Sequence, residues 1–471
     1  MGITKEGQKD LGIFLLSMIG VAAVLSIRNI PSMAEFGALS IFYWVIAAVT
    51  ILIPVSFISG ELSTAWPKNG GFAVWIREAF GNRWGFSASW IYWLANVIWL
   101  PTVLSFTAAT IAYIFLPSLV NNHIYMMGVI LIILWGGTFV NFLRVKISGL
   151  ISSIGVMLGT IIPGVILIVM GIIWIATGHP SQIHFSASNM LPNFNNLGTI
   201  EFAAAALLSY VGIELLGVYA NHVKNPRRTY PRAILLAVLV ILLVYIIATL
   251  AVAAVVPHGK LSLVAGLMQA FEAFFDQYNL RWLVPLLAAL TAIGAIALIN
   301  TWILGPAKAF GVTAKDGVLP PILQRHNTND APVSILILQA TIGSALVLPF
   351  VLFPSINESY WILTASTTQL YAVVYLLIFV SFLKLRYTRS DVPRPYKVPG
   401  GKIGMWSVAI PGIGGSLFAL IVGFFPPSGI GVTSPVIYES FMLISFATYI
   451  LLPFLIYHFR RDSWKPKGGE S

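Results

Sequence analysis

The chain has 471 residues, of which 58% are hydrophobic and only 9% are charged. A soluble domain carries roughly 25% charged residues, so this composition, with a mean hydropathy of +0.88, indicates a polytopic membrane protein. The absence of cysteine excludes disulfides, zinc–thiolate sites and iron–sulfur clusters. The net charge of +11 does not indicate a nucleic-acid partner, because the basic residues are dispersed among short loops.

Apolar stretches long enough to cross a bilayer, about 20 residues each, predict an all-α protein with twelve transmembrane helices. We number them spans 1 to 12, and they fall near 10–36, 39–65, 84–117, 124–143, 148–177, 198–220, 231–256, 283–305, 333–354, 359–384, 407–426 and 434–458. The polar start of the chain has no small-x-small cleavage site, so we expect an uncleaved first span rather than a signal peptide. We interpret residues 1–471 as one transmembrane domain in the lipid bilayer.

Two spans carry polar interruptions. Span 1 contains the run Ser26-Ile27-Arg28-Asn29-Ile30-Pro31, and span 6 contains Ser209, Tyr210, Gly212 and Glu214 in its middle. A carboxylate at bilayer depth costs roughly 2.5–3.5 kcal/mol and usually marks a substrate or ion path. Interruptions five spans apart suggest two inverted repeats, 10–177 and 198–384, with a site between them and two further helices at 407–458.

Four loop motifs resemble those of a known protein family. They are Glu61-Leu62-Ser63 after span 2, Lys224–Arg228 after span 6, Ala314–Pro321 after span 8 and Arg394–Gly401 before span 11. Together, from about residue 10 to 458, the chain resembles the amino acid–polyamine–organocation superfamily of transporters. The run Leu208–Glu214 and the Pro31-Ser32-Met33 turn are similar to those of bacterial glutamate/γ-aminobutyrate antiporters.

The resemblance implies a five-plus-five inverted repeat with helices 1 and 6 broken at the midplane. It also implies a secondary active antiporter of the cell membrane that exchanges glutamate or a related amino acid for γ-aminobutyrate or another amino acid by alternating access. A broad-specificity or cationic amino acid exchanger, or a proton-coupled permease of the same fold, is the alternative. No cofactor is expected, and a homodimer is possible. An enzyme would need a catalytic cluster in one group of spans, and a sensor would need a sizeable soluble domain. The sequence has neither feature, so a transporter is expected rather than an enzyme or a sensor.

The two interruptions provide backbone groups that suit an amino acid. Amide N–H groups at the start of a half-helix suit the carboxylate, and in span 1 they would come from Val24, Leu25, Ser26 and Ile27. Unwound carbonyls near Ser209 and Tyr210 would suit the ammonium. Local bonding of the Ser26 and Ser209 hydroxyls to a helical carbonyl is the alternative.

Charged residues within the spans have several possible roles. Arg28 would favour a substrate with an acidic side chain, or else it forms an ion pair with Glu35 or Glu214. Glu214 is a candidate proton carrier, gate or counter-charge, and its alternative is a carboxylate neutralised by a neighbouring helix for packing alone.

Other site residues follow from the resemblance. The family lines its site from the spans that here carry Asn96, Asn300, Trp302, Ser366 and Thr367. Trp302 aligns with an aromatic position that shapes the pocket in relatives, although a membrane tryptophan often only packs or anchors.

The chain also departs from its family. Val24-Leu25-Ser26 replaces a Gly-Ser-Gly run, which leaves the backbone less free to bend, and Leu298 replaces an acidic residue found in some exchangers. No basic residue lies near Gly159-Thr160 in span 5, where some relatives have a sodium-replacing lysine.

Three further patterns concern helix packing, a surface segment and metal binding. Gly155 and Gly159 form a GxxxG pattern that predicts close helix packing. The external segment Leu261–Tyr278 is amphipathic, as expected of a helix that caps the outer vestibule or of a plain surface helix. No histidine pair has the spacing of a metal site, so no metal is expected.

The distribution of basic residues predicts the orientation of the chain. Apart from Arg28, Lys260 and Arg281, the other 24 of the 27 Lys and Arg residues fall in one alternating set of loops and tails, which we expect to be cytoplasmic together with both termini. Accessibility tags at the C-terminus and in the 386–404 loop should therefore report the cytoplasm, and a tag in the 426–434 loop should report the outside. Detection of both loops on one side would contradict the twelve-span topology.

Overall fold

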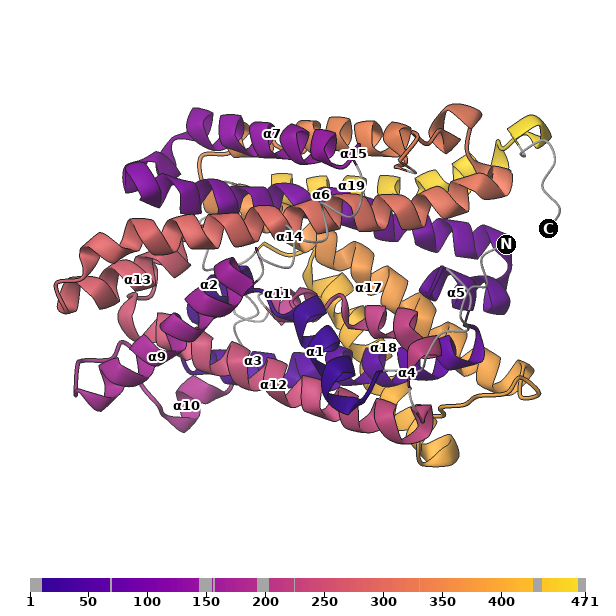
Figure 1. Ribbon diagram of the computed structural model, residues 1–471, viewed down its shortest axis with the longest axis horizontal. Helices are drawn as coiled ribbons and strands as arrows, with labels where there is room; N and C mark the ends of the chain where they lie inside the picture. Colours follow the sequence, from indigo (N-terminus) through magenta and orange to yellow (C-terminus); the bar gives the residue numbers. More distant parts are fainter. Residues whose placement is uncertain are drawn as a thin grey trace.

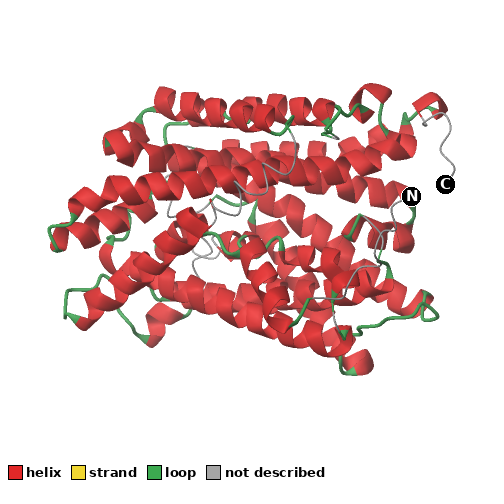
Figure 2. Cartoon of the chain, in the orientation of Figure 1, coloured by secondary structure: helices red, strands yellow, loops and turns green. Residues whose placement is uncertain are grey.

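The computed structural model describes residues 11–67, 70–143, 155, 157–192, 203–223, 225–329, 331–426 and 434–464. In these ranges the chain is helical, and its only β-type pairing is an isolated bridge between Leu11 and Val223 (Figure 2). Parts of the predicted spans 5 and 6, at 148–154 and 198–202, and most of the 426–434 loop lie outside the described residues.

The described residues include ten helices that are long and apolar enough to cross a membrane. They are α3 (Leu39–Ala47) with α4 (Ile53–Ala65), α6 (Asn82–Phe115), α7 (His123–Val140), α9 (Ile162–Ala176), α12 (Pro226–Val255), α14 (Val284–Thr313), α15 (Val333–Ala345) with α16 (Pro349–Leu352), α17 (Ile356–Thr388), α18 (Gly401–Val422) and α19 (Pro435–His458). A bent pair in span 1 raises the number to eleven. Span 6 is represented by the shorter apolar helical stretch Ala203–Gly217, so the count of twelve and the inverted repeat stay predictions.

The long helices are arranged around α6. In the view of Figure 1, α6, α7, α14, α15 and α19 form one layer, and α1 (Ile13–Val24), α3, α4 and α12 form the other. Helix α6 packs along α14 and α17, while α1 packs on α12. In the most apolar stretch of α6, 83% of the residues are buried, whereas in the corresponding stretch of α19 only 11% are buried. Helix α6 is therefore a central element, and α19 lies at the periphery.

The close helix packing predicted from the glycines of span 5 occurs against α14. Gly155 and Gly159 face α14, where Gly159 lies directly against Gly294. A Cβ atom built on Gly294 would lie 2.5 Å from the Cα of Gly159, which is closer than real Cβ contacts. Only hydrogen atoms fit between the two backbones, as in small-residue packing of membrane helices.

Contacts between loops group them as the charge pattern predicts. At one end, Leu11 pairs with Val223, and Arg227 donates to the carbonyl of Pro395. These segments all belong to the set that we expect in the cytoplasm. The grouping into ends agrees with the prediction, and which end faces the cytoplasm stays a prediction.

The opposite end carries the amphipathic helix that the sequence predicts. Helix α13 (Gly266–Gln277) buries its apolar face and packs against α9, α12 and α14. It also reaches the second half of span 1, because a Cβ on Gly266 would lie 2.9 Å from Cβ of Pro31. The segment is thus packed over the broken helix rather than lying free on the surface.

The close approach of Gly159 and Gly294 leads to a stability prediction with a control on the same helix. Gly294→Ala should lower the thermal unfolding midpoint in detergent, because overpacking typically costs about 1–3 kcal/mol. Gly305→Ala should leave it unchanged or slightly raised, since nothing lies within 4 Å of a Cβ there. Equal midpoints for the two variants would show that α14 and span 5 are not in close contact.

Candidate functional site

Span 1 is broken in its middle. Helix α1 ends at Val24, Leu25 and Ser26 are extended, and the chain resumes as η1 (Ile27–Asn29) and α2 (Ile30–Ala34) at an angle of 47°. Ser26 has φ −138° and ψ 121°, a conformation that any L-residue adopts readily. The break therefore forms without glycine at either extended position.

Span 6 is broken beside it. Helix α11 (Ala203–Leu208) ends in a turn, and the chain continues as the 3₁₀ segment η6 (Ile213–His222). Gly212 in the turn has φ +110°, which favours glycine. A Cβ on Gly212 would lie 2.8 Å from the carbonyl oxygen of Ala23, so the two broken spans touch at their breaks.

One hydroxyl group on α12 joins both breaks. The Tyr245 hydroxyl accepts from the amide of Ser26 at 3.1 Å and from Asn29 Nδ2 at 3.3 Å. Its single hydrogen faces two acceptors, the carbonyl oxygen of Val24 at 2.9 Å and that of Ser209 at 3.3 Å. Because backbone groups inside a bilayer must find partners within the protein, this hydroxyl stabilises the interruption of both helices.

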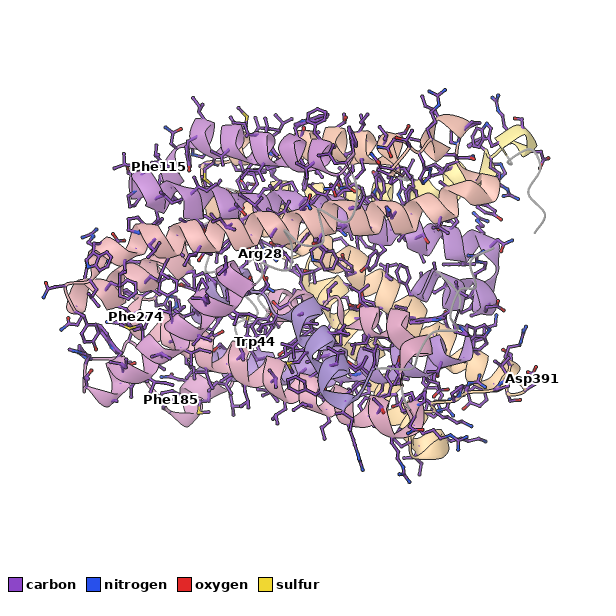
Figure 3. The ribbon with its side chains drawn as sticks, in the orientation of Figure 1. Arg28, Trp44, Phe115, Phe185, Phe274 and Asp391 are labelled. Atoms are coloured by element: carbon purple, nitrogen blue, oxygen red, sulfur yellow. The ribbon has the colours of Figure 1, made fainter. Side chains whose placement is uncertain are left out.

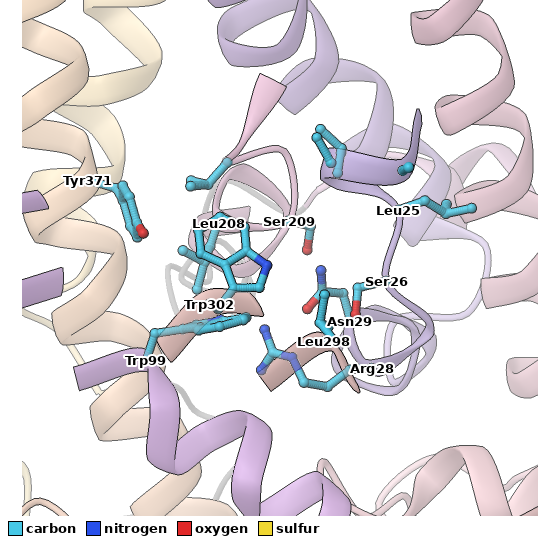
Figure 4. Close-up of a pocket in the computed structure, with 14 residues that line it drawn as sticks. Leu25, Ser26, Arg28, Asn29, Trp99, Leu208, Ser209, Leu298, Trp302 and Tyr371 are labelled. Carbon is cyan, nitrogen blue, oxygen red and sulfur yellow. The ribbon is translucent and has the colours of Figure 1, made fainter. Parts of the chain in front are cut away.

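The breaks border a cavity (Figure 4). Its described lining residues are Ala22, Ala23, Val24, Leu25, Ser26, Arg28, Asn29, Trp99, Leu208, Ser209, Val211, Leu298, Trp302 and Tyr371. Of the residues singled out from the sequence, the structure brings six to this cavity: Val24, Leu25, Ser26, Arg28, Ser209 and Trp302. Leu298 lies there too.

The other candidate residues lie behind the cavity lining. Ile27 is buried against Gly164 of span 5, and the Tyr210 hydroxyl donates to the carbonyl of Trp44. Asn96 is 1% exposed, and neither atom of its amide has a hydrogen-bond partner among the described residues. Gly212 and Glu214 lie in the second break, beside the cavity rather than in its lining.

The backbone groups of the breaks are partly occupied. The amide of Leu25 donates to the carbonyl of Val21, and that of Ser26 donates to Tyr245. The Ser209 hydroxyl donates to the carbonyl of Ala205, four residues earlier, which is the local bonding considered as an alternative. The polar character of this cavity therefore depends mainly on side chains.

Arg28 is the charged residue of the cavity lining. It is 4% exposed and lies near the middle of the molecule (Figure 3). Its Nη1 donates to Thr102 Oγ1 at 3.2 Å and to the Tyr360 hydroxyl at 2.9 Å, and its guanidinium lies 5.3 Å from the centre of the Trp99 ring. No carboxylate pairs with Arg28 within the described ranges.

The ion pairs suggested for Arg28 are therefore wrong. Glu35 lies at the C-terminal end of span 1, where its Oε1 accepts from the amide of Gly259 at 2.8 Å and lies 2.7 Å from Nδ1 of His258. Glu35 and Arg28 are seven positions apart, and the nearer turn at 258–259 provides the partners of the carboxylate.

Glu214 is held by neutral donors. Its Oε1 accepts from the Tyr92 hydroxyl at 3.0 Å, and its Oε2 accepts from the Tyr375 hydroxyl at 2.9 Å and from the amide of Gly212 at 3.0 Å. Tyr92 belongs to α6 and Tyr375 to α17, so the carboxylate links the broken span 6 to two other helices. Tyr371, which lines the cavity, lies 5.2 Å from Tyr92 between ring centres.

Several residues of the site were missed from the sequence. Asn29, Trp99 and Tyr371 line the cavity, while Tyr245 and Tyr360 hold its polar groups in place. The position of Asn29 beside Arg28 in the interruption was a usable signal. The aromatic residues carried none, because aromatic side chains occur throughout the spans and nothing in their spacing distinguishes these four. Among the described residues, no three His, Asp or Glu come together to hold a metal ion.

Comparison with known proteins agrees with this architecture. The amino acid permease family matches residues 11–447. An uncharacterized transporter of Legionella pneumophila is 39% identical over 450 residues, covering 96% of this chain and 97% of that protein. A glutamate/γ-aminobutyrate antiporter of Lactococcus lactis is 30% identical over 458 residues (96% and 90%), and a cadaverine/lysine antiporter of Escherichia coli is 27% identical over 353 residues (73% and 74%). The chain belongs to the amino acid permease family of the amino acid–polyamine–organocation superfamily, and it is a multi-pass membrane transporter of amino acids or polyamines.

Proposed function

We propose that this protein is a cell-membrane antiporter that exchanges glutamate, or a related acidic amino acid, for γ-aminobutyrate or another amino acid by alternating access. The observation that carries the proposal is the buried guanidinium of Arg28 in a cavity whose described lining contains no carboxylate. The glutamate/γ-aminobutyrate antiporter of Lactococcus lactis supports it, since 96% of this chain aligns with that protein.

The charge of the cavity favours an acidic ligand. Arginine stays protonated in proteins, so at this depth Arg28 needs a negative partner or strong hydrogen-bond acceptors. Its present partners, Thr102 and Tyr360, are neutral. A substrate carboxylate is therefore the anion that would offset the buried charge.

The same charge argues against the alternative of a cationic substrate. The Escherichia coli relative is a cadaverine/lysine antiporter, and a diamine or lysine would bring a second ammonium group into the site. In this chain Leu298 provides no counter-charge in span 8, and Arg28 would repel the extra cation. The single ammonium of glutamate or γ-aminobutyrate can instead lie against the Trp99 and Trp302 rings, whose centres are 5.3 Å apart.

Glu214 is the candidate gate for alternating access. Its carboxylate connects the broken span 6 to α6 and α17, so movement of span 6 away from these helices must break the bonds to Tyr92 and Tyr375. Protonation of the carboxylate would weaken both bonds, because a neutral carboxyl group accepts hydrogen bonds less strongly. Release of span 6 from α6 and α17 would therefore depend on pH.

Arg28→Ala tests the substrate class. The variant should weaken glutamate transport relative to glutamine by roughly tenfold to hundredfold, since a hydrogen bond to a charged group contributes about 1.5–3 kcal/mol. Counterflow into proteoliposomes, with and without trapped amino acid, measures both the exchange and the selectivity. Equal losses for the two substrates in a well-folded variant would contradict recognition of an acidic side chain.

Glu214→Gln tests the gate. Glutamine keeps the size and one acceptor but cannot titrate, so transport should fall and its pH dependence should flatten while folding is retained. The matched control is Tyr375→Phe, which removes one bond to the carboxylate and leaves it titratable. A pH–rate profile of Glu214→Gln that matches the unmodified protein would place the proton-sensitive group elsewhere.

A further inference from the structure

We propose that Thr102 and Tyr360 are positioning residues that turn Arg28 so that its Nε and Nη2 face the substrate as one two-donor edge. This edge would bind the side-chain carboxylate of the substrate and set the preference for glutamate over glutamine. The inference rests on the proposed function, which assigns an acidic substrate to the cavity. It adds the residues that orient the guanidinium for recognition of the substrate carboxylate.

One end of the guanidinium is already occupied. Nη1 carries two N–H bonds, and it meets two acceptors, Thr102 Oγ1 at 3.2 Å and the Tyr360 hydroxyl at 2.9 Å. The Thr102 hydroxyl donates its own hydrogen to the carbonyl of Trp99 at 2.7 Å. Its oxygen is therefore oriented to accept from Arg28, and Nη1 is unavailable for a substrate.

Aromatic rings restrict the plane of the guanidinium. Its central carbon lies 5.3 Å from the centre of the Trp99 ring and 5.9 Å from that of Tyr360. Trp99 and Thr102 are three positions apart on α6, and Tyr360 lies near the start of α17. Two helices other than the one that carries Arg28 thus hold its orientation.

The remaining edge meets no hydrogen-bond partner in the part of the chain that the structure describes. Nε is buried and has no hydrogen-bond partner among the described residues, and no bond from Nη2 occurs there either. The side chain as a whole is 96% buried, given its exposure of 4%. A buried donor without a partner is costly, and here it borders the cavity between the two breaks (Figure 4).

The chemistry of this edge distinguishes a carboxylate from a carboxamide. Two parallel N–H donors match the two oxygens of a carboxylate in a bidentate pair. A carboxamide offers one oxygen, and its NH₂ group would face an N–H donor. Glutamine would therefore leave one donor unpaired, which is how a polar site rejects an analogue of the same size.

The test compares glutamate and glutamine counterflow in proteoliposomes for Thr102→Val, Tyr360→Phe and Arg28→Lys. Thr102→Val and Tyr360→Phe should each raise the KM for glutamate by about two- to tenfold, with the KM for glutamine and both maximal rates unchanged. Arg28→Lys keeps the charge but lacks the two-donor edge, so it should also lose the preference for glutamate.

Matched controls remove hydroxyls elsewhere. Thr107 lies on the same helix as Thr102, and Thr107→Val removes the bond from its hydroxyl to the carbonyl of Val103. Tyr125→Phe removes a bond to the carbonyl of Ala108. Both should leave the two KM values unchanged, which shows that loss of a hydroxyl alone does not change selectivity.

The outcomes separate the two proposals. If Arg28→Ala abolishes the glutamate preference while Thr102→Val and Tyr360→Phe leave it intact, the positioning role is overturned and the proposed function stands. Equal KM increases for glutamate and glutamine in these variants, or full preference in Arg28→Lys, would also overturn the two-donor edge. If the unmodified protein shows no glutamate preference, the proposed function itself fails.

Discussion

The site depends on one constraint, that polar groups freed by breaking a helix inside a bilayer must find partners within the protein. The Tyr245 hydroxyl meets much of this requirement for both breaks, through Ser26, Val24, Asn29 and Ser209. Its ring stacks on Trp44 at 4.3 Å, and the Trp44 indole donates to Thr249 on the same helix as Tyr245. A rigid, fully buried tyrosine thus fixes two interrupted helices against each other, and the cavity lies where they meet.

The buried charges of the two breaks are stabilised in the same way, by hydroxyl groups from neighbouring helices. Arg28 in span 1 is held by Thr102 and Tyr360, and Glu214 in span 6 is held by Tyr92 and Tyr375. The partners come from α6 and α17 in both cases. Since hydroxyls carry no net charge, these bonds hold the two side chains in place without neutralising either charge.

The close contact of Gly159 with Gly294 serves a related purpose away from the cavity. It joins span 5 to α14, the helix that carries Leu298 and Trp302 of the cavity lining. Small-residue packing of this kind gives contact without side-chain rearrangement. The wall formed by α14 is therefore anchored from behind while its other face borders the cavity.

The sequence by itself determined the features that depend on local composition: most of the spans, the positions of both breaks, the close glycine packing and the presence of Arg28 in a break. These follow from apolar run length, from polar residues inside such runs and from spacing. Only the tertiary structure decided the partners of the charges. Tyr360 lies 332 residues from Arg28, and Tyr245 lies 221 residues from Val24, and nothing in the sequence connects either tyrosine with its partner. Glu35 joined His258 instead of Arg28 because helix direction and loop packing, rather than sequence separation, set which groups meet.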